Sequence, residues 1–187
     1  MKTNTKKLTT LAMLAAISII LVYLIHFPIF PSAAFLEYDP ADIPIFIGTL
    51  MFGPWSGLIL TVVASVIQGI TVSAGSGIIG IIMHTLSTGS FVLVAGLIYL
   101  RKKTLPRAIV ALACGVLVMT TIMVLWNIIF TPIFMGAPRQ VVLDMLFPVI
   151  LPFNFIKAGV NGLITGVIYV SLSAILKKSK LGLDFSL

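Results

Sequence analysis

The chain of 187 residues is 59% hydrophobic and 9% charged, with a mean hydropathy of +1.20. Soluble globular domains are about 45–50% apolar and about 25% charged, so this composition excludes a water-soluble domain and indicates a surface that faces lipid. The net charge of +7 does not indicate a nucleic-acid partner, because the basic residues gather at the ends of apolar stretches.

These basic clusters predict the orientation of the chain. Ten of the twelve basic residues lie in three groups: Lys2, Lys6 and Lys7; Arg101, Lys102, Lys103 and Arg107; and Lys177, Lys178 and Lys180. Such groups stay on the cytoplasmic side of a membrane. At about 20 apolar residues per crossing, the length allows about five to seven helices, and an even number places all three groups on one side. We therefore predict one all-α membrane domain over residues 1–187, with six helices and both termini cytoplasmic.

The predicted spans, in chain order, are 8–27, 40–53, 54–73, 78–100, 106–131 and 152–176. The first is longer than the apolar core of a signal peptide, which has about 7–15 residues, so we expect a retained helix. Asp39 is the expected N-cap of the second span, with Pro40 at N1 and Asp42 at N3. The fifth span is expected to end before Pro132, and an outer segment that carries Arg139 and Asp144 follows it.

The acidic residues indicate where ligand chemistry lies. Glu37, Asp39, Asp42 and Asp144 all map to the outer side of this topology, and only Asp184 lies in the tail. Asp42 is assigned to the capped outer end of the second span, so no carboxylate is expected in the interior of a span, which gives little support for coupling to protons or sodium. A binding site that faces outward is the expected arrangement.

The sixth span carries the densest set of polar residues. Asn154, Lys157 and Asn161 are spaced i, i+3, i+7 and share one helix face. Lys157 alone is explained equally by its side chain reaching toward the outer interface, but that does not explain two asparagines on the same face. A buried Lys costs about 2.5–3.5 kcal/mol, which a ligand or Asp144 would offset. We expect this face to contact a ligand.

Other polar residues have competing structural explanations. Asn127 either joins the ligand site or makes a hydrogen bond between helices, and for His84 and Gln68 the hydrogen bond is favoured. His84 has no partner at metal-ligand spacing, so no metal site is expected. Glu37 and Tyr38 lie in an outer loop that either closes over a ligand or rests on lipid headgroups.

Enzymatic functions have little support in the sequence. Gly75-Ser76-Gly77 resembles the serine turn of an intramembrane protease, but no histidine has a convincing catalytic context. No Gly-x-x-x-x-Gly-Lys-Ser/Thr motif is present, so energy for transport must come from an ion gradient or from another subunit. Ala12 and Ala16, one helical turn apart, allow close approach of a helix, either from a partner or from this chain.

Three segments carry a resemblance to a known family. They are Leu11-Ala12-Met13-Leu14-Ala15-Ala16, Phe35-Leu36-Glu37-Tyr38-Asp39-Pro40-Ala41-Asp42-Ile43-Pro44, and Leu151-Pro152-Phe153-Asn154-Phe155-Ile156-Lys157-Ala158-Gly159-Val160-Asn161-Gly162. With them, essentially the whole chain resembles the substrate-binding S components of energy-coupling-factor (ECF) vitamin transporters, and within these the riboflavin-specific branch. The alanine pair marks S components generally, whereas the other two segments are more specific to the flavin-binding branch.

This resemblance implies a function, partners and a site. It implies a multi-pass protein of a prokaryotic cell membrane that captures riboflavin as transported substrate, with no cofactor and no enzymatic activity. The implied ligand contacts are Leu36, Glu37 and Tyr38 in the first-loop lid, and Asn127, Asn154, Lys157 and Asn161 in the pocket wall. Ala12 and Ala16 are the implied contacts with a transmembrane coupling subunit, which works with two ATPase subunits. The alternatives are an S component for thiamine or folate, a self-sufficient secondary transporter, and an intramembrane enzyme.

Overall fold

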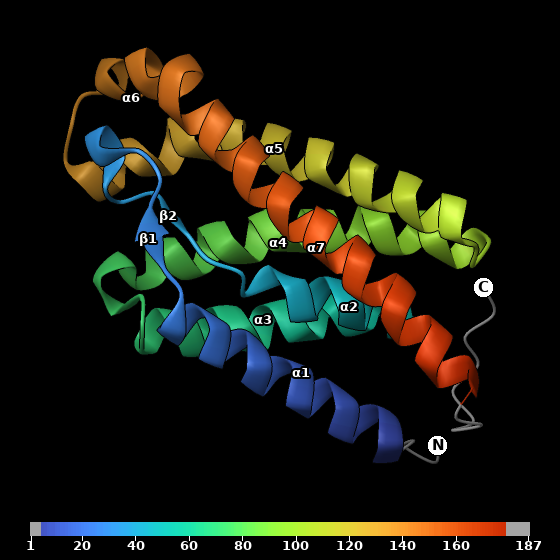
Figure 1. Cartoon of the computed structure of the whole chain (residues 1–187). Helices are drawn as coiled ribbons and strands as arrows, with labels where there is room; N and C mark the ends of the chain where they lie inside the picture. Colours follow the sequence, from blue (N-terminus) through green and yellow to red (C-terminus); the bar gives the residue numbers. More distant parts are fainter. Residues whose placement is uncertain (1–4, 179–187) are drawn as a thin grey trace.

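The computed structural model describes residues 5–178 as a helical bundle with a short β-ribbon at one end (Figure 1). The helices are α1 (Thr5–Leu24), α2 (Asp42–Phe52), α3 (Pro54–Ile70), α4 (Gly77–Arg101), α5 (Leu105–Met135), α6 (Arg139–Met145) and α7 (Leu151–Lys178). Strands β1 (Phe27–Pro28) and β2 (Glu37–Tyr38) form the antiparallel ribbon, in which Phe27 lies opposite Tyr38. Short 3₁₀ turns cover Pro31–Ala33 and Ala74–Ser76, and a π turn covers Leu146–Ile150.

Four of these helical stretches are long and apolar enough to cross a membrane. They are Thr5–Leu24, Ala74–Arg101, Leu105–Met135 and Arg139–Ser171, the last formed by α6, the π turn and the first part of α7. Helices α2 and α3 are apolar but shorter, with 11 and 17 residues. Because α6 continues into α7, the described part of the chain forms an all-helical membrane bundle of six helical units.

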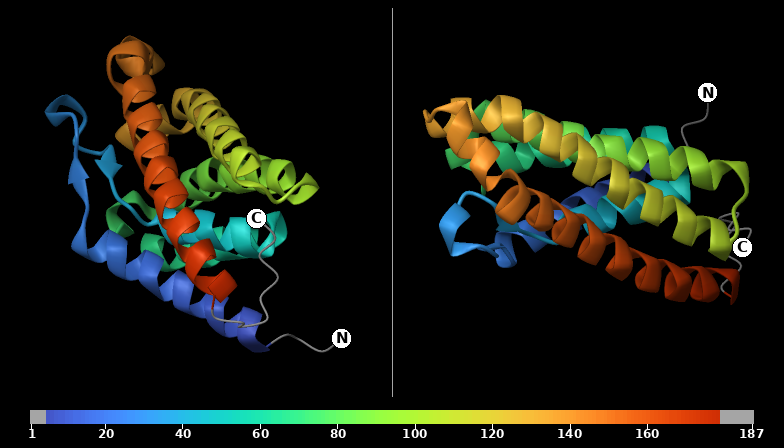
Figure 2. Two further views of the ribbon diagram at one scale, coloured as in Figure 1. Left: turned by 45° about the vertical axis from the view of Figure 1, so that its right-hand side comes forward. Right: turned by 90° about the horizontal axis from the view of Figure 1, so that it is seen from above.

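The two ends of the bundle differ in charge. The first turn of α1, the connection between α4 and α5, and the last turn of α7 lie at one end (Figures 1 and 2). This basic end therefore holds Lys6, Lys7, Arg107 and residues 101–103. The β-ribbon, α6 and the 3₁₀ turn before α4 lie at the opposite end, which we call the ribbon end.

The predicted end of the fifth span was wrong. Helix α5 does not stop before Pro132 but continues for one turn to Met135, and Gly136, with φ of 61°, ends it in the left-handed conformation. Pro132 lies in the last turn of this 31-residue helix, where it removes a single backbone donor without ending the helix. The segment that follows, which carries Arg139 and Asp144, forms helix α6. It joins α7 through a π turn around Pro148.

Helix α2 lies at the centre of the bundle. Every residue from 41 to 50 is buried, and α1, α3, α4 and α7 all contact this helix. The ring of Phe46 stacks on Phe91 of α4 with 3.6 Å between centroids. A second apolar cluster lies at the ribbon end, where Leu36 of the hairpin packs against Val142 and Phe153. This cluster holds the hairpin (residues 27–38) against α6 and α7.

Close packing of α3 against α4 depends on Gly96. A Cβ atom at this position would lie 2.7 Å from Cβ and 2.8 Å from Cα of Pro54. Gly96→Ala is therefore expected to lower the free energy of unfolding by about 1–3 kcal/mol, because the backbone of α3 must shift. Thermal unfolding in detergent measures this. Gly159→Ala is the matched control, because a Cβ there meets no atom within 4 Å; equal destabilisation by both variants would contradict the packing argument.

Candidate functional site

A cavity of about 780 Å³, part of it open to solvent, lies at the ribbon end among the hairpin, α4, α5 and α7. We call it the main cavity. It is lined by Phe35, Leu36, Glu37, Ser76, Ile79, Gly80, Met83, His84, Ser87, Met119, Met123, Asn127, Thr131, Phe134, Phe153, Asn154 and Lys157.

The lining combines two kinds of side chain. Phenylalanine, methionine, leucine and isoleucine side chains form the apolar surface, and thioethers adapt well to the faces of aromatic rings. Asn127, Asn154, Lys157 and Glu37 supply polar groups at separate points. Such a lining suits a flat ligand that has an apolar edge and a polar edge.

Both asparagines of the cavity wall are held by their own helices. The Asn127 amide nitrogen donates to Met123 O at 2.7 Å, and its Oδ1 accepts from the Thr131 hydroxyl at 2.8 Å. The Asn154 amide nitrogen donates to Ile150 O at 2.7 Å. These bonds fix each side chain in orientation, and because an amide nitrogen carries two hydrogens, each leaves one hydrogen unused.

Lys157 makes a contact that the sequence did not predict. Its Nζ lies 2.7 Å from Asp39 Oδ2 and donates to Glu37 O at 3.2 Å. The side chains of Lys157 and Asp39 are only 14% and 10% exposed, so the pair is largely shielded from solvent. Of the explanations offered from the sequence, an amine extended to the interface and a bond to Asp144 do not hold, because Lys157 binds Asp39 and Asp144 bonds to Gln140. Contact of Lys157 with a ligand stays a prediction.

Asp39 therefore has two roles. One oxygen accepts from Ala41 N at 3.0 Å, which supports the backbone just before α2, and the other binds Lys157. Helix α2 begins at Asp42, with Ala41 in the N-cap position, so the expected N-cap was placed too early. The ion pair joins the segment just before α2 to the second turn of α7.

Asn161 lies behind the main cavity and does not line it. Its side chain accepts from the Tyr38 hydroxyl at 3.0 Å and donates to Asp39 O at 2.9 Å, and the nearest Asp42 oxygen is 3.4 Å away. Burial, and next the nearby Asp39 carboxylate, raises the pKa of Tyr38, so its hydroxyl stays protonated and donates. Tyr38 is also absent from the cavity lining. Both residues tie the hairpin to α7 in this conformation.

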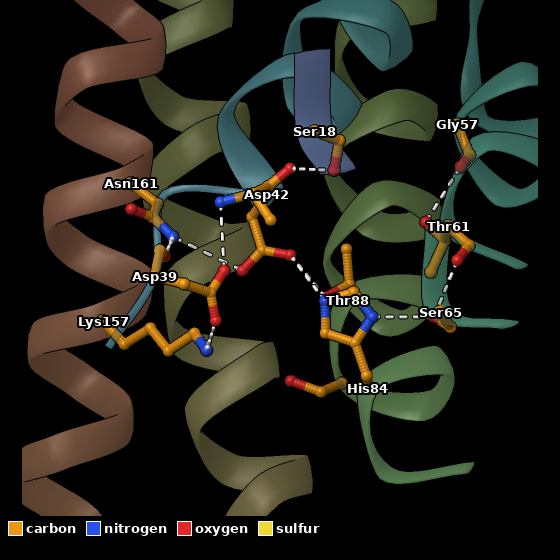
Figure 3. A network of polar contacts seen from close by, with 12 residues as sticks. Ser18, Asp39, Asp42, Gly57, Thr61, Ser65, His84, Thr88, Lys157 and Asn161 are labelled. Carbon is orange, nitrogen blue, oxygen red and sulfur yellow. Dashed lines mark hydrogen bonds and ion pairs between the residues drawn. The ribbon is translucent and has the colours of Figure 1, made fainter. Parts of the chain in front are cut away.

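Asp42 is the residue whose role the sequence concealed. Its side chain is fully buried within the bundle, whereas we expected a capping group and no carboxylate inside a span. The Thr88 hydroxyl donates to its Oδ1 at 2.7 Å, and His84 Nε2 lies 3.2 Å from the same atom (Figure 3). The other His84 ring nitrogen lies 2.7 Å from the Ser65 hydroxyl. A signal was present in the sequence: His84 and Thr88 are spaced i, i+4 and therefore share one helix face.

The alanine pair lies outside the bundle. Ala12 and Ala16 are exposed on α1, whereas Ser18 of the same helix points inward and donates to Ala41 O at 2.7 Å. Close packing of this pair within the described bundle is thus not observed, and its face is available to another helix. Among the side chains that the structure describes (residues 5–171), no group of three or more His, Cys, Asp or Glu lies close enough to hold a metal ion.

Comparisons with known proteins match nearly the whole chain. A family model described as "ECF transporter, substrate-specific component" matches residues 6–169. The riboflavin transporter RibU of Streptococcus thermophilus is 28% identical over 184 residues, covering 94% of this chain and 87% of the relative. The riboflavin transporter RibU of Staphylococcus aureus is 29% identical over 179 residues, covering 92% and 93%.

Two further matches agree with these. The riboflavin transporter FmnP of Bacillus subtilis is 26% identical over 175 residues, covering 89% of this chain and 92% of the relative. A solved structure described as "Structure and mechanism of the S component of a bacterial ECF transporter" superimposes with a TM-score of 0.81 at 30% identity. That match covers 94% of this chain and 99% of the solved chain.

Proposed function

We propose that riboflavin is the substrate of this chain. The chain belongs to the substrate-specific components of ECF transporters. It is thus a multi-pass bacterial membrane protein that binds a transported substrate and is not an enzyme. The observation that carries the proposal is the main cavity, where a methionine- and phenylalanine-rich surface faces fixed amide and amine donors. Riboflavin has a flat ring with a dimethylbenzene edge and a pyrimidine edge. The relatives named riboflavin transporters support the same substrate.

The wall residues have distinct proposed roles. Asn127 and Asn154 present amide donors to the acceptors of the pyrimidine edge, and Lys157 donates from the junction of the hairpin with α7. Riboflavin is uncharged, and the Lys157–Asp39 pair is neutral in sum, so Lys157 needs no negatively charged group on the ligand. Leu36 and Glu37 cover the ligand from the hairpin, which acts as a lid, and Tyr38 and Asn161 hold that lid to α7.

Topology and partners follow from the same proposal. The basic end faces the cytoplasm, as the positive-inside rule requires, and the ribbon end with its cavity faces outward. A member of this family associates with an ECF energising module. We assign that module a transmembrane coupling subunit and two ATPase subunits, and we assign the exposed Ala12–Ala16 face to the coupling subunit.

Ala12→Leu tests the assigned contact. The larger side chain projects from α1 where another helix must approach closely, so riboflavin uptake by the complete transporter should fall at least tenfold. Riboflavin binding by the isolated chain should not change, because Ala12 is remote from the main cavity. Met13→Leu, also exposed on α1, is the size-matched control and should preserve uptake. Normal uptake with Ala12→Leu would reject this contact.

Two assays separate the proposal from its alternatives. The purified chain is denatured and the released small molecules are identified after growth with riboflavin, thiamine and folate together. Riboflavin in near-stoichiometric amount supports the proposal, whereas thiamine or folate in its place would reassign the substrate. In vesicles, the chain alone should not accumulate riboflavin, and uptake should require the ATPase partners. Accumulation by the chain alone would instead indicate a secondary transporter.

A further inference from the structure

A second cavity adjoins the main one and has a different chemical character. This side cavity, of about 610 Å³, is lined by Val22, His26, Phe35, Glu37, Asp39, Ser65, Gln68, Gly69, Ser73, Ser76, Gly80, His84 and Lys157. Six of these residues, Phe35, Glu37, Ser76, Gly80, His84 and Lys157, also line the main cavity, so the two spaces meet there. The side cavity extends toward α1 and α3, away from the methionine-rich surface of α4 and α5.

Most of the charged side chains and imidazole rings around the side cavity already have hydrogen-bond partners within the protein. His84 lies between Asp42 and Ser65, and Lys157 binds Asp39 (Figure 3). The Nδ1 atom of His26 lies 2.9 Å from Val22 O. These groups form a polar wall whose hydrogen bonds are largely made within the protein.

Gln68 is the exception. It lies near the end of α3, is only 6% exposed, and lines the side cavity. Its Nε2 atom is fully shielded and has no hydrogen-bond partner among the residues that the structure describes. Leaving a buried donor unpaired costs free energy, so native proteins rarely keep one without a use for it. Because Gln68 lines the side cavity, rotation of its terminal amide turns this donor toward that space, where a ligand can supply the acceptor.

We propose that Gln68 is a specificity-determining residue that donates a hydrogen bond to a hydroxyl group on the substrate's polyol chain. In this arrangement the polyol chain enters the side cavity and the ring stays in the main cavity. This inference rests on the proposed function. A hydroxyl oxygen has two acceptor lone pairs and one donor hydrogen, so it can satisfy the Gln68 amide and also bond to the serines nearby. The substrate class is therefore a heteroaromatic ring with a hydroxylated chain, and α3 contributes to its recognition.

The proposed contact of Gln68 with the polyol chain predicts different effects on two flavins that have the same ring system. Riboflavin carries a ribityl chain, and lumiflavin carries a methyl group in its place. Gln68→Leu and Gln68→Met both remove the donor, and each should weaken riboflavin binding about two- to tenfold, as expected for one hydrogen bond. Lumiflavin affinity should stay within about twofold of that of the unaltered chain, because the ring contacts are intact. Since the donor has no partner in the ligand-free bundle, neither variant should lower thermal stability.

Thr120→Val is the matched control. Its hydroxyl is the other shielded and unpartnered side-chain atom in the described part of the chain, and it lines neither cavity. Thr120→Val should change the affinity for neither riboflavin nor lumiflavin. Equal losses for riboflavin and lumiflavin in the Gln68 variants, or no loss for either, would overturn the role of Gln68 and leave the riboflavin proposal intact. Failure of the unaltered chain to bind riboflavin would overturn the proposed function itself.

Discussion

Replacing Lys157 with Met is expected to weaken riboflavin binding by about two orders of magnitude. The substitution removes a donor from the cavity wall and leaves the Asp39 carboxylate, of which 10% is exposed, without its partner at 2.7 Å. Truncating one member of a shielded, hydrogen-bonded charge pair costs about 2–5 kcal/mol, and every 1.4 kcal/mol is tenfold in affinity. The hairpin should also loosen, because Lys157 holds the backbone of Glu37. Titration with riboflavin measures the effect.

Two further variants show whether the lost affinity in Lys157→Met comes from breaking the pair with Asp39. Asp39→Asn keeps a side chain of the same shape but removes the negative charge, so it should weaken binding less than Lys157→Met does. Asp144→Asn is the control, because Asp144 bonds to Gln140 and not to Lys157. It should leave the affinity unchanged. If Lys157→Met binds riboflavin as tightly as the unaltered chain, Lys157 is not part of the site.

Replacing Asp42 with Ala is expected to be the most destabilising change in the bundle, at about 3–5 kcal/mol. The substitution removes the acceptor of Thr88 and the partner of His84 from a site with no exposed side-chain surface. Each buried donor left unpaired costs about 1–3 kcal/mol, and Asp42→Ala leaves two of them, on Thr88 and His84, without their acceptor. Thermal unfolding of the ligand-free chain in detergent gives the measurement.

Asp42→Asn should be milder, because the amide oxygen still accepts from the Thr88 hydroxyl. Glu37→Gln is the control for loss of an acidic residue at the same end of the bundle. The Glu37 side chain is exposed, so its replacement should change stability by no more than about 0.5 kcal/mol. Similar melting temperatures for Asp42→Ala and the unaltered chain would show that the buried network does not stabilise the fold.

Hydropathy and charge predicted much of the architecture, because lipid imposes strong constraints on a sequence. Apolar runs bounded by basic clusters leave few possible helical arrangements. Boundaries near Pro132 and Pro148 were less predictable. A proline weakens a helix by one hydrogen bond, and whether the helix continues depends on tertiary packing, here between α6, the hairpin and α7.

The site was predictable where polar residues share one helix face and less so where partners come from distant segments. Asn154 and Lys157 line the main cavity, but Asn161 of the same face binds the hairpin instead. Asp42 was assigned to a cap because Asp-Pro-x-Asp is a common helix start, and only the packing of α2 against α4 brings it to His84. A local pattern does not specify a contact between residues 42 positions apart.

The riboflavin assignment is tested most directly by titrating the purified, ligand-free chain with riboflavin. Trp126 directly precedes the cavity residue Asn127 in the sequence, so quenching of tryptophan fluorescence reports binding. We predict saturable quenching at one riboflavin per chain, which thiamine and folate do not reproduce. Absence of saturable binding to a folded chain, or equal binding of thiamine or folate, would contradict the assignment.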